Sequence, residues 1–484
     1  MRTRSLLKYS LGGLVGAAVP ALIITGTAFA DDTDPLAAVE DLGHQTNLLW
    51  VVIGAVLVIF MQAGFAMVET GFTQKKNAAH VMSTNFAIFG LGFVGFLFIG
   101  FPLAFAAFDG SAYFGAGGAP MNSEPLIGSG NWGFLYWGYD HLGSAATPAL
   151  LAFFLYMVAF MDTTATIPTG SMAERWKWKS FVIWGLFCGA IYYPLFAAWT
   201  WGGGWLGKTW DTMSLGAGYV DFAGSGVVHA TGGVAALAGA LVLGPRKGKY
   251  GADGKPRAIP GHNIPMAIAG CFILLFGWFG FNAASTFAAT DIQFATVAAN
   301  TAIAAAVGAT AAIFWVTWRT GKPDPGMMVN GMLAGLVGIT APCAFVDPWA
   351  AAVIGLLAAI IVIEFAWWLD RRGVDDPVGA VAVHGIGGTF GVIALGLFAN
   401  GRYGGGWNGS SVEGVKGLFY GSGGAGQLGA QLVGVAVLWT VILGVAFAFF
   451  KIQDKLTKGG IRLPEDIEVE GADLPEMGVL AYTD

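Results

Sequence analysis

Apolar residues form long runs between Leu48 and Phe450, and short polar segments separate the runs. Eleven of these runs approach the roughly 20 residues that a helix needs to cross a bilayer. We expect them at about 48–70, 84–107, 146–170, 180–201, 219–243, 263–285, 294–318, 328–346, 349–369, 379–399 and 425–450. The pattern predicts an all-α polytopic membrane protein with eleven transmembrane helices.

The first thirty residues differ from these runs. Arg2, Arg4 and Lys8 precede an apolar stretch that ends near Thr25, and an Ala-Phe-Ala sequence closes at Ala30. This is the pattern of a secretory signal peptide with its cleavage site. Because the apolar stretch is short and contains a proline, the pattern favours a cleaved signal peptide, 1–30, over an uncleaved first span.

Lysine and arginine are distributed unevenly over the connecting segments. If the first span starts outside, the inside segments hold eighteen of them and the outside loops only three, namely Lys208, Arg402 and Lys416. Cytoplasmic loops carry the excess of positive charge in membrane proteins. The mature chain is therefore predicted to have its amino terminus outside and its carboxyl terminus inside.

Composition narrows the class of protein further. Charged residues make up 11% of the chain and the formal net charge is -6, whereas an average soluble protein is about 25% charged. These values exclude a soluble globular enzyme and a nucleic-acid binder that relies on basic charge. The 75 glycines suit helices that pack closely through small residues. The three cysteines, Cys188, Cys271 and Cys343, indicate neither a disulfide framework nor a metal cluster.

Two segments of the chain resemble each other. One runs from Asp221 to Gly233 in the fifth run, the other from Asp376 to Gly388 in the tenth, and without gaps Asp, Gly, Val, His, Gly and Gly coincide. Because five spans separate the copies, they should cross the membrane in opposite directions, as in an inverted repeat with its site near the midplane. We expect a first half at 31–243, an inverted half at 244–399, a loop and eleventh outer helix at 400–450, and a cytoplasmic tail at 451–484.

Two histidines, His229 and His384, occupy equivalent places in these segments. An ionisable residue deep in a span indicates a functional site. Facing imidazoles share one proton when one ring nitrogen donates and the other accepts, which suits a path for a small polar solute or a proton. Structural packing remains the alternative. A metal site is disfavoured because two histidines without nearby carboxylate or thiolate are a poor ligand set.

Acidic residues near the runs fall into two groups. Asp221, Asp375 and Asp376 lie close to helix starts, where a carboxylate caps backbone N–H groups. Asp221 would in addition place a negative field at an outer vestibule. Three further carboxylates lie inside spans without a partner that the sequence identifies: Glu69, Asp162 and Glu364.

Aromatic residues gather toward the outer ends of three runs. The sixth run ends with Trp278, Phe281 and Ser285, the fourth ends at Trp201, and the third carries an aromatic pair, Tyr156 and Phe160, spaced to share one helix face. Aromatic residues at these depths often anchor a helix in the bilayer interface. Their faces also attract cations, so rings with one hydroxyl would suit a small monovalent cation.

These residues together resemble the ammonium transporter family (Amt/Mep/Rh), in its bacterial Amt type. The similarity extends from Gly64-Phe-Ala-Met-Val-Glu-Thr in the first run to Pro464-Glu-Asp in the tail. Its most specific motifs are Asp221-Phe-Ala-Gly with Val-His229, Gly277-Trp-Phe-Gly-Phe-Asn-Ala, Met172-Ala-Glu-Arg175, and Asp375-Asp-Pro with Val-His384-Gly.

The resemblance implies a role for each site residue. Ammonium is recruited outside by Trp201, Phe160 and Ser285, with Asp221 as an acid beneath that is not a direct ligand. Phe160 and Phe281 form the gate of the pore, and Trp278 lines it beside His229 and His384. Two residues that differ from many relatives are candidates to modify the pore: Tyr156 and Asp162.

The resemblance also implies a homotrimer in the cell (plasma or inner) membrane, without a cofactor, and with a cytoplasmic PII-type signal protein as partner. We expect that ammonium loses its proton at the outer site, that ammonia crosses between the histidines, and that the proton follows separately; methylammonium would serve as analogue. A passive ammonia gas channel and an ammonium sensor remain alternatives. No nucleophile–base set supports an enzyme.

Overall fold

The computed structural model describes residues 35–105 and 139–483. The expected signal peptide, 1–30, and residues 106–138 lie outside this part of the chain. Contacts divide the chain into two units, residues 1–46 and 47–484. The first unit is described only through the beginning of helix α2, Pro35–Phe72, whereas the second holds the rest of α2 and the elements that follow.

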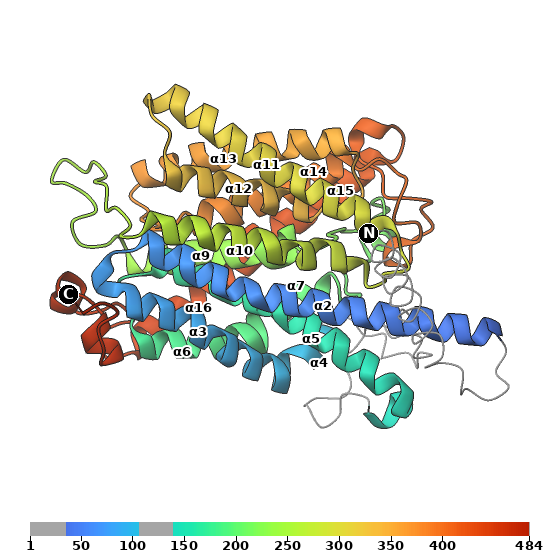
Figure 1. Cartoon of the computed structure of the whole chain (residues 1–484), viewed down its shortest axis with the longest axis horizontal. Coiled ribbons are helices and arrows are strands. Elements are labelled where there is room, and N and C mark those ends of the chain that lie inside the picture. The colour runs from blue at the N-terminus through green and yellow to red at the C-terminus, as the bar shows by residue number, and fades with distance from the viewer. Residues whose placement is uncertain (1–34, 106–138, 484) are drawn as a thin grey trace, which may run out of the picture. The chain divides into compact units, whose positions relative to one another are not determined.

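All regular elements in the described residues are helices (Figure 1). In chain order the main ones after α2 are α3 (Ala78–Gly95) with η2 (Phe96–Gly100) and α4 (Phe101–Phe105), α5 (Tyr139–Met172), α6 (Trp178–Phe187) with η5 (Cys188–Tyr192) and α7 (Tyr193–Trp199), α8 (Thr209–Thr212), η6 (Ser225–Ala230) with α9 (Thr231–Leu243), α10 (Ile264–Asn282) with η7 (Ala283–Thr286), α11 (Gln293–Thr320), α12 (Pro325–Thr340), α13 (Pro348–Arg371), η8 (Val381–Ile386) with α14 (Gly387–Phe398), α15 (Gly424–Val437) with η11 (Leu438–Ile442) and α16 (Leu443–Leu456), and α17 (Glu465–Glu470) with η12 (Asp473–Met477).

The predicted number of spans is confirmed. Within the described residues, ten helical segments are long and apolar enough to cross a membrane, and α12 is a shorter apolar helix packed between α11 and α13. Each of these eleven overlaps one predicted run. The chain is therefore an all-α polytopic membrane protein, while the direction in which it crosses the membrane stays a prediction.

Several predicted boundaries are wrong. The first span was expected from residue 48, but α2 begins at Pro35. The fifth span was expected from residue 219, but its helix begins at Ser225, after a non-helical segment in which Gly224 has a positive φ of 115°. The eighth was expected to reach residue 346, but α12 ends at Thr340. The residues after Thr340 are not helical, and the Asn300 side chain of α11 donates hydrogen bonds to two of their carbonyl oxygens, those of Cys343 and Val346. Apolar composition alone does not distinguish such buried irregular backbone from helix.

The spans differ in how deeply they lie within the second unit. In the most apolar stretches of the third and fifth spans, within Leu151–Met172 and Ser225–Leu243, 89% and 83% of the residues are buried. In the corresponding stretch of Gly424–Leu456 only 22% are buried. The last span is thus an outer helix, as predicted.

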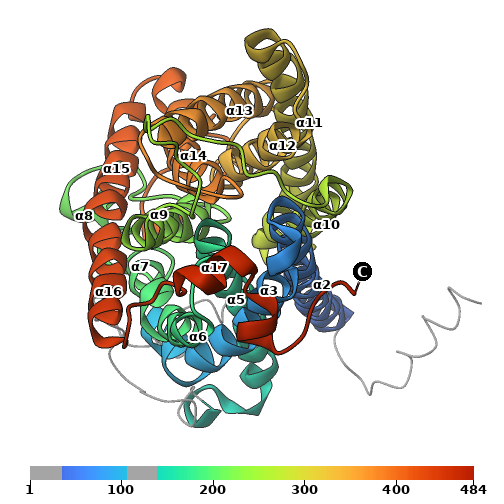
Figure 2. The same cartoon turned by 90° about the vertical axis from the view of Figure 1, so that its left-hand side faces the viewer.

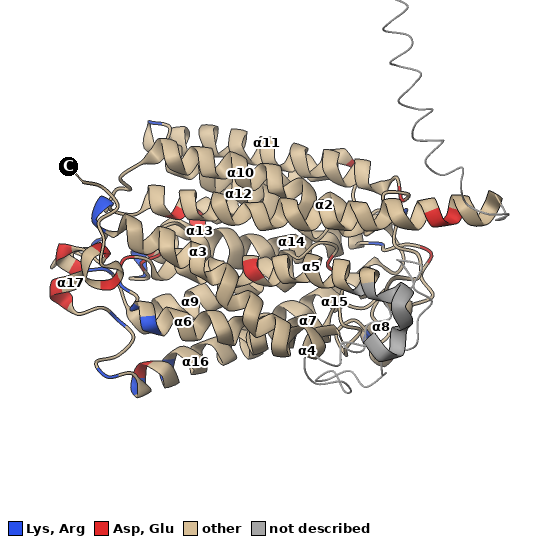
Figure 3. Ribbon diagram, turned by 60° about the horizontal axis from the view of Figure 1, so that its bottom comes forward, with Lys and Arg blue, Asp and Glu red and all other residues tan. Residues whose placement is uncertain are grey.

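Figure 2 looks along the helices from the end where α17 lies across them, and Figure 3 shows most Lys and Arg residues at that same end.

The two similar segments have equivalent local structure. Asp221 and Asp376 each accept hydrogen bonds from backbone N–H groups four and five residues later, and the glycines three residues later, Gly224 and Gly379, both have positive φ. Both histidines then follow within a π-helical turn, η6 and η8. The matching residue types therefore support matching backbone geometry.

These segments also pass each other in opposite directions. A Cβ added to Gly388, in α14, would meet the backbone of Ser225, at the start of η6, whereas one added to Gly233, in α9, would meet the backbone of Gly385. Later residues of one segment thus face earlier residues of the other. This arrangement supports the inverted repeat, and the paired glycines permit the close approach.

Candidate functional site

The twin histidines face each other in the interior. The Nδ1 atoms of His229 and His384 lie 3.2 Å apart, and both side chains are buried. Such a contact requires one nitrogen to donate and the other to accept, so the pair shares a single proton there. Nε2 of His229 has no hydrogen-bond partner among the described residues. Each histidine lies in a π-helical turn, a local irregularity that is frequent at functional sites.

Aromatic rings lie next to each histidine of the pair. Phe281 lies 5.2 Å from the His229 ring, centroid to centroid, and 4.1 Å from Phe160, whereas Phe65 lies 6.0 Å from His384. Phe160 and Phe281, the pair predicted to form the gate, are thus in ring contact. With Trp201, whose ring is 5.8 Å from Phe160, these residues form a continuous ring column through the unit.

Trp278 also lies against the histidine pair. Its ring stacks on His229 at 5.0 Å with an interplanar angle of 20°, and its Nε1 donates to Oγ1 of Thr340 at 2.9 Å. The indole N–H is therefore satisfied by α12 and the apolar ring face is turned toward the imidazole. Sequence reasoning identified Trp278 but not Thr340, which lies 62 positions away at the end of a different helix.

The predicted recruitment residues come together at the Trp201 end of the ring column. Phe160 lies between Trp201 and Tyr156, and the Tyr156 ring is 4.8 Å from it. The Tyr156 hydroxyl lies 3.1 Å from Oγ of Ser285 and donates to the carbonyl oxygen of Gly280 at 2.9 Å. Tyr156, predicted only as a modifier of the pore, thus positions the serine of the site.

Both carboxylate oxygens of Asp221 accept hydrogen bonds from backbone N–H groups next to this site. Its two carboxylate oxygens accept from the N–H groups of Gly224, Ser225, Gly226 and Val227 at 2.7–3.0 Å. Its carbonyl oxygen accepts from Nε1 of Trp201 at 2.7 Å. The predicted cap is confirmed, and these contacts make Asp221 a positioning residue that orients both the outer tryptophan and the helix of His229.

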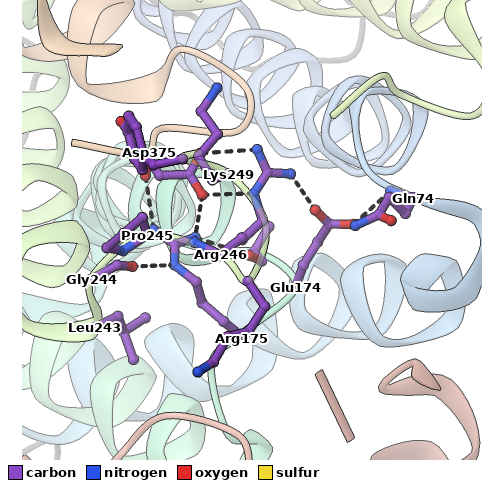
Figure 4. A network of polar contacts seen from close by, with 12 residues as sticks. Gln74, Glu174, Arg175, Leu243, Gly244, Pro245, Arg246, Lys249 and Asp375 are labelled. Carbon is purple, nitrogen blue, oxygen red and sulfur yellow. Dashed lines mark hydrogen bonds and ion pairs between the residues drawn. The ribbon is translucent and has the colours of Figure 1, made fainter. Parts of the chain in front are cut away.

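Asp376 caps η8 in the same manner, but the predicted cap by Asp375 is wrong. Its carboxylate instead accepts from the guanidinium and the backbone N–H of Arg246, and Arg246 also pairs with Glu174 (Figure 4). Asp375 precedes the capping residue and faces away from the helix start. Its carbonyl oxygen accepts from Nη2 of Arg175 at 2.8 Å, so the carboxylate and backbone of Asp375 serve two arginines.

Charge governs the protonation of this network. Burial of the Asp375 carboxyl opposes its ionisation, but the hydrogen bonds and positive charge of Arg246, together with Arg175, outweigh burial and lower its pKa to about 2. Glu174 also accepts from the backbone N–H of Gln74 and from Asn77. The network thus ties four connecting segments together beside the start of the His384 helix.

Two of the three unassigned carboxylates inside spans have partners. Glu69 accepts from Nδ2 of Asn85 and lies beside Thr169, whereas Glu364 contacts Arg319 and Nε1 of Trp315. Oδ1 of Asp162 is buried without a hydrogen-bond partner among the described residues.

The tail is held against the end of the unit that carries the basic residues. Lys76 donates to the carbonyl oxygens of Glu468 and Val469, and Arg462 pairs with Glu468. Asp473 accepts from the backbone N–H of His80 at the start of α3. The sequence predicts the tail at this end but does not indicate these contacts, of which those of Lys76 and His80 join residues about 390 positions apart.

Comparisons with known proteins agree with this geometry. A family model described as Ammonium Transporter Family matches residues 49–482. Ammonium transporter Amt2 of Archaeoglobus fulgidus is 42% identical over 475 residues, which cover 98% of this chain and 96% of that protein. The solved structure named "Sensor Amt Protein" has a TM-score of 0.78 at 33% identity, covering 90% of this chain and 100% of that one. Mep2 of Candida albicans has a TM-score of 0.74 at 30% identity, covering 90% of each chain. The chain belongs to the ammonium transporter family.

Proposed function

We propose that this multi-pass protein of the cell membrane recruits ammonium outside, removes its proton and conducts ammonia through the ring column, with the proton carried separately over the histidine pair. The observation that carries the proposal is the 3.2 Å contact between His229 and His384 at the centre of that column. Net transport would then be electrogenic. The orientation that this requires, amino terminus outside and tail inside, rests on the distribution of basic residues.

Selectivity is the physical problem that such a column solves. Ammonium and potassium are both costly to bring from water into an apolar environment. Ammonium alone can leave a proton behind and continue as a neutral molecule. A gate formed by Phe160 and Phe281 offers no acceptor to a bare ion, and the first nitrogen beyond it belongs to His229. The gate therefore favours the species that has shed its charge.

The outer site supports recruitment of the charged form. Trp201 and Phe160 lie in ring contact within one cluster, and Ser285 adds a hydroxyl oxygen. Ring faces attract cations, with gains of about 0.5–2 kcal/mol depending on desolvation. A passive gas channel would not need such a site, so the cluster favours ammonium recruitment over the gas channel.

The decisive experiment replaces both histidines. His229→Ala with His384→Ala should abolish the selective ammonium current of proteoliposomes on a solid-supported membrane, because no group remains to pass the proton. His262→Ala is the matched control, since His262 lies outside the ring column and contacts the backbone of Thr73. Unchanged current with unchanged exclusion of potassium in the double variant would disprove the relay. A wild-type protein that moves ammonia without current would be a gas channel.

A sensor is the second candidate, because one similar solved structure carries that word in its name. The proposal for this chain is transport, by a homotrimer with one pore per subunit and with a PII-type protein at the tail end. Growth of cells that lack ammonium uptake separates the two functions. A transporter restores growth on limiting ammonium, whereas a sensor does not.

A further inference from the structure

A second polar site lies on the far side of the histidine pair from the outer cluster. A hollow there has mostly apolar walls, with Phe65 and Leu274 among them, and its polar side chains are those of Glu69, Asn330 and His384. All three polar side chains are more than nine-tenths buried. Glu69 lies three residues before the end of α2 and Asn330 in the first half of α12, so the hollow faces the tail end of the unit.

The carboxyl group of Glu69 is held in a fixed position. Nδ2 of Asn85 donates to its Oε2 at 2.7 Å, while Oδ1 of Asn85 accepts from Thr166, which fixes the orientation of that amide. Gly170 leaves room for the group, because a Cβ there would lie 3.1 Å from Oε1. The side chain is therefore presented to the hollow by three neighbours from α3 and α5.

The surroundings of Thr169 bear on the protonation of Glu69. Oγ1 of Thr169 lies 2.9 Å from both carboxyl oxygens of Glu69 and 2.5 Å from the carbonyl oxygen of Thr166. A hydroxyl has one hydrogen, and a carbonyl oxygen can only accept. When the threonine donates to the closer carbonyl, its contact with Glu69 needs a hydrogen on the carboxyl group. The geometry thus accommodates both a carboxylate and a protonated acid.

Asn330 supplies an unused acceptor in the same hollow. Its Oδ1 is buried without a hydrogen-bond partner among the described residues, whereas Nδ2 lies against Gly379. A buried acceptor without a donor is unfavourable, so the site favours a ligand that brings N–H groups. An acid, a free carbonyl oxygen and apolar walls together suit a small cation with several donors and no acceptor. Ammonium meets all these requirements.

We propose that this hollow is an inner ammonium site in which Glu69 returns a proton to ammonia. Ammonia that has passed His384 takes the hydrogen of the Glu69 carboxyl group, so that one O–H bond breaks and one N–H bond forms. The resulting ammonium is paired with the carboxylate and donates to Oδ1 of Asn330. The proton that ammonium lost at the outer site then restores Glu69 by way of the histidine pair. This inference rests on the transport function proposed above.

Infrared difference spectroscopy tests the protonation change without requiring transport. Adding ammonium, but not potassium, to the wild-type protein should remove a protonated-carboxyl C=O band and add carboxylate bands. Both changes should vanish in Glu69→Gln and persist in the control Glu364→Gln, whose carboxylate instead pairs with Arg319 in another span. The same bands in Glu69→Gln, or their absence from the wild type, would overturn the inner site.

Transport kinetics test the role of the site in turnover. Glu69→Gln should lower the maximal ammonium current by at least about tenfold, as expected when a proton-transferring group is lost, while half-saturating external ammonium changes less than about twofold. Asn330→Leu should lower the maximal current in the same direction, and Asn330→Asp, which restores an acceptor oxygen, should recover it. A raised half-saturation with unchanged maximal current would contradict the proposal. Glu69→Asp keeps the acid and controls for misfolding.

The two experiments separate this inference from the transport function. If the wild type gives the ammonium-dependent infrared change but no ammonium current, electrogenic transport fails and the site stands as a binding site. If the current is normal and the infrared change does not depend on Glu69, transport stands and the inner site fails.

Discussion

Trp201 links the proposed cation site to the backbone that adjoins it. Its ring lies edge-on to Phe160 at 5.8 Å, and its Nε1 donates to the carbonyl oxygen of Asp221. The indole is therefore held in one orientation at the entrance of the ring column. A tryptophan face fixed before the ligand arrives loses little conformational entropy on binding.

Replacing Trp201 by leucine should weaken recruitment of the cation. Loss of a cation–π contact of about 1–2 kcal/mol should raise the half-saturating ammonium concentration about tenfold, while the maximal current changes less. The concentration dependence of the ammonium-evoked current measures this. Trp349→Leu is the control, since that exposed tryptophan packs on Phe398 outside the column. An equal shift in both variants, or a loss of maximal current alone, would argue against a recruiting role.

At the residue scale, the sequence identified which side chains meet but not what orients them. The internal repeat predicts that His229 and His384 meet, and the family resemblance implies that Phe160 and Phe281 do; these rings do lie in contact. Thr340 belongs to a different helix from Trp278, and an ordinary threonine in an apolar run carries no pattern of its own. Tyr156 shares a helix face with Phe160, but its contact with Ser285 joins two different helical segments. Their roles arise only when the helices pack.

At the scale of elements, the histidine helices depend on buried polar groups at their starts. Asp375 and Arg246 form an ion pair at 2.8 Å in which both side chains are almost fully buried. Removing one member of a buried pair leaves a charge that neither water nor protein compensates, which typically costs about 3–5 kcal/mol. Asp376, which follows Asp375 directly, accepts from the N–H groups at the start of η8, so the start of this helix is tied to the pair.

Asp375→Asn should therefore lower the thermal unfolding midpoint clearly, whereas Glu465→Gln should change it little. Glu465 pairs with Lys247 at the surface, where both side chains are largely exposed, and such pairs contribute about 0–1 kcal/mol. Because the folded pKa of Asp375 is depressed to about 2, its contribution is present above the ordinary carboxyl value of 3.8 and is lost as pH falls through about 2. Unfolding midpoints measured across this window should fall for the wild type and stay flatter for Asp375→Asn. Parallel curves would exclude the pair as the cause.

Sequence patterns predicted the eleven helices but not their irregular turns. The runs at 219–243 and 379–399 read as uniform helices because apolar content carries no information on hydrogen-bond register. In the structure each contains a π-helical turn at its histidine, preceded by a glycine of positive φ. The equal spacing of Asp, Gly and His in the two segments is the sequence feature that corresponds to this geometry. The aspartate accepts from backbone N–H groups and the glycine has a positive φ.

At the scale of the whole molecule, the direction in which the chain crosses the membrane decides which proposed site faces the outside and which faces the cytoplasm. Eighteen lysines and arginines belong to the predicted inside segments and three to the predicted outside loops. The cluster around Trp201 recruits external ammonium only in this orientation, and in the reverse one the hollow with Glu69 would face outward. The structure fixes which residues share an end of the unit, whereas the surrounding membrane fixes which end is inside.

Single introduced cysteines test this orientation directly. The native Cys188, Cys271 and Cys343 are buried, so a membrane-impermeant maleimide should leave them unlabelled. Lys416→Cys, in the loop before α15, should react in intact cells, whereas Lys458→Cys, after α16, should react only once the membrane is permeabilised. Both lysines are exposed, so accessibility of the side chain does not bias the comparison. Labelling of the position after α16 in intact cells would reverse the topology, and ammonium recruitment at Trp201 would then begin from the cytoplasm.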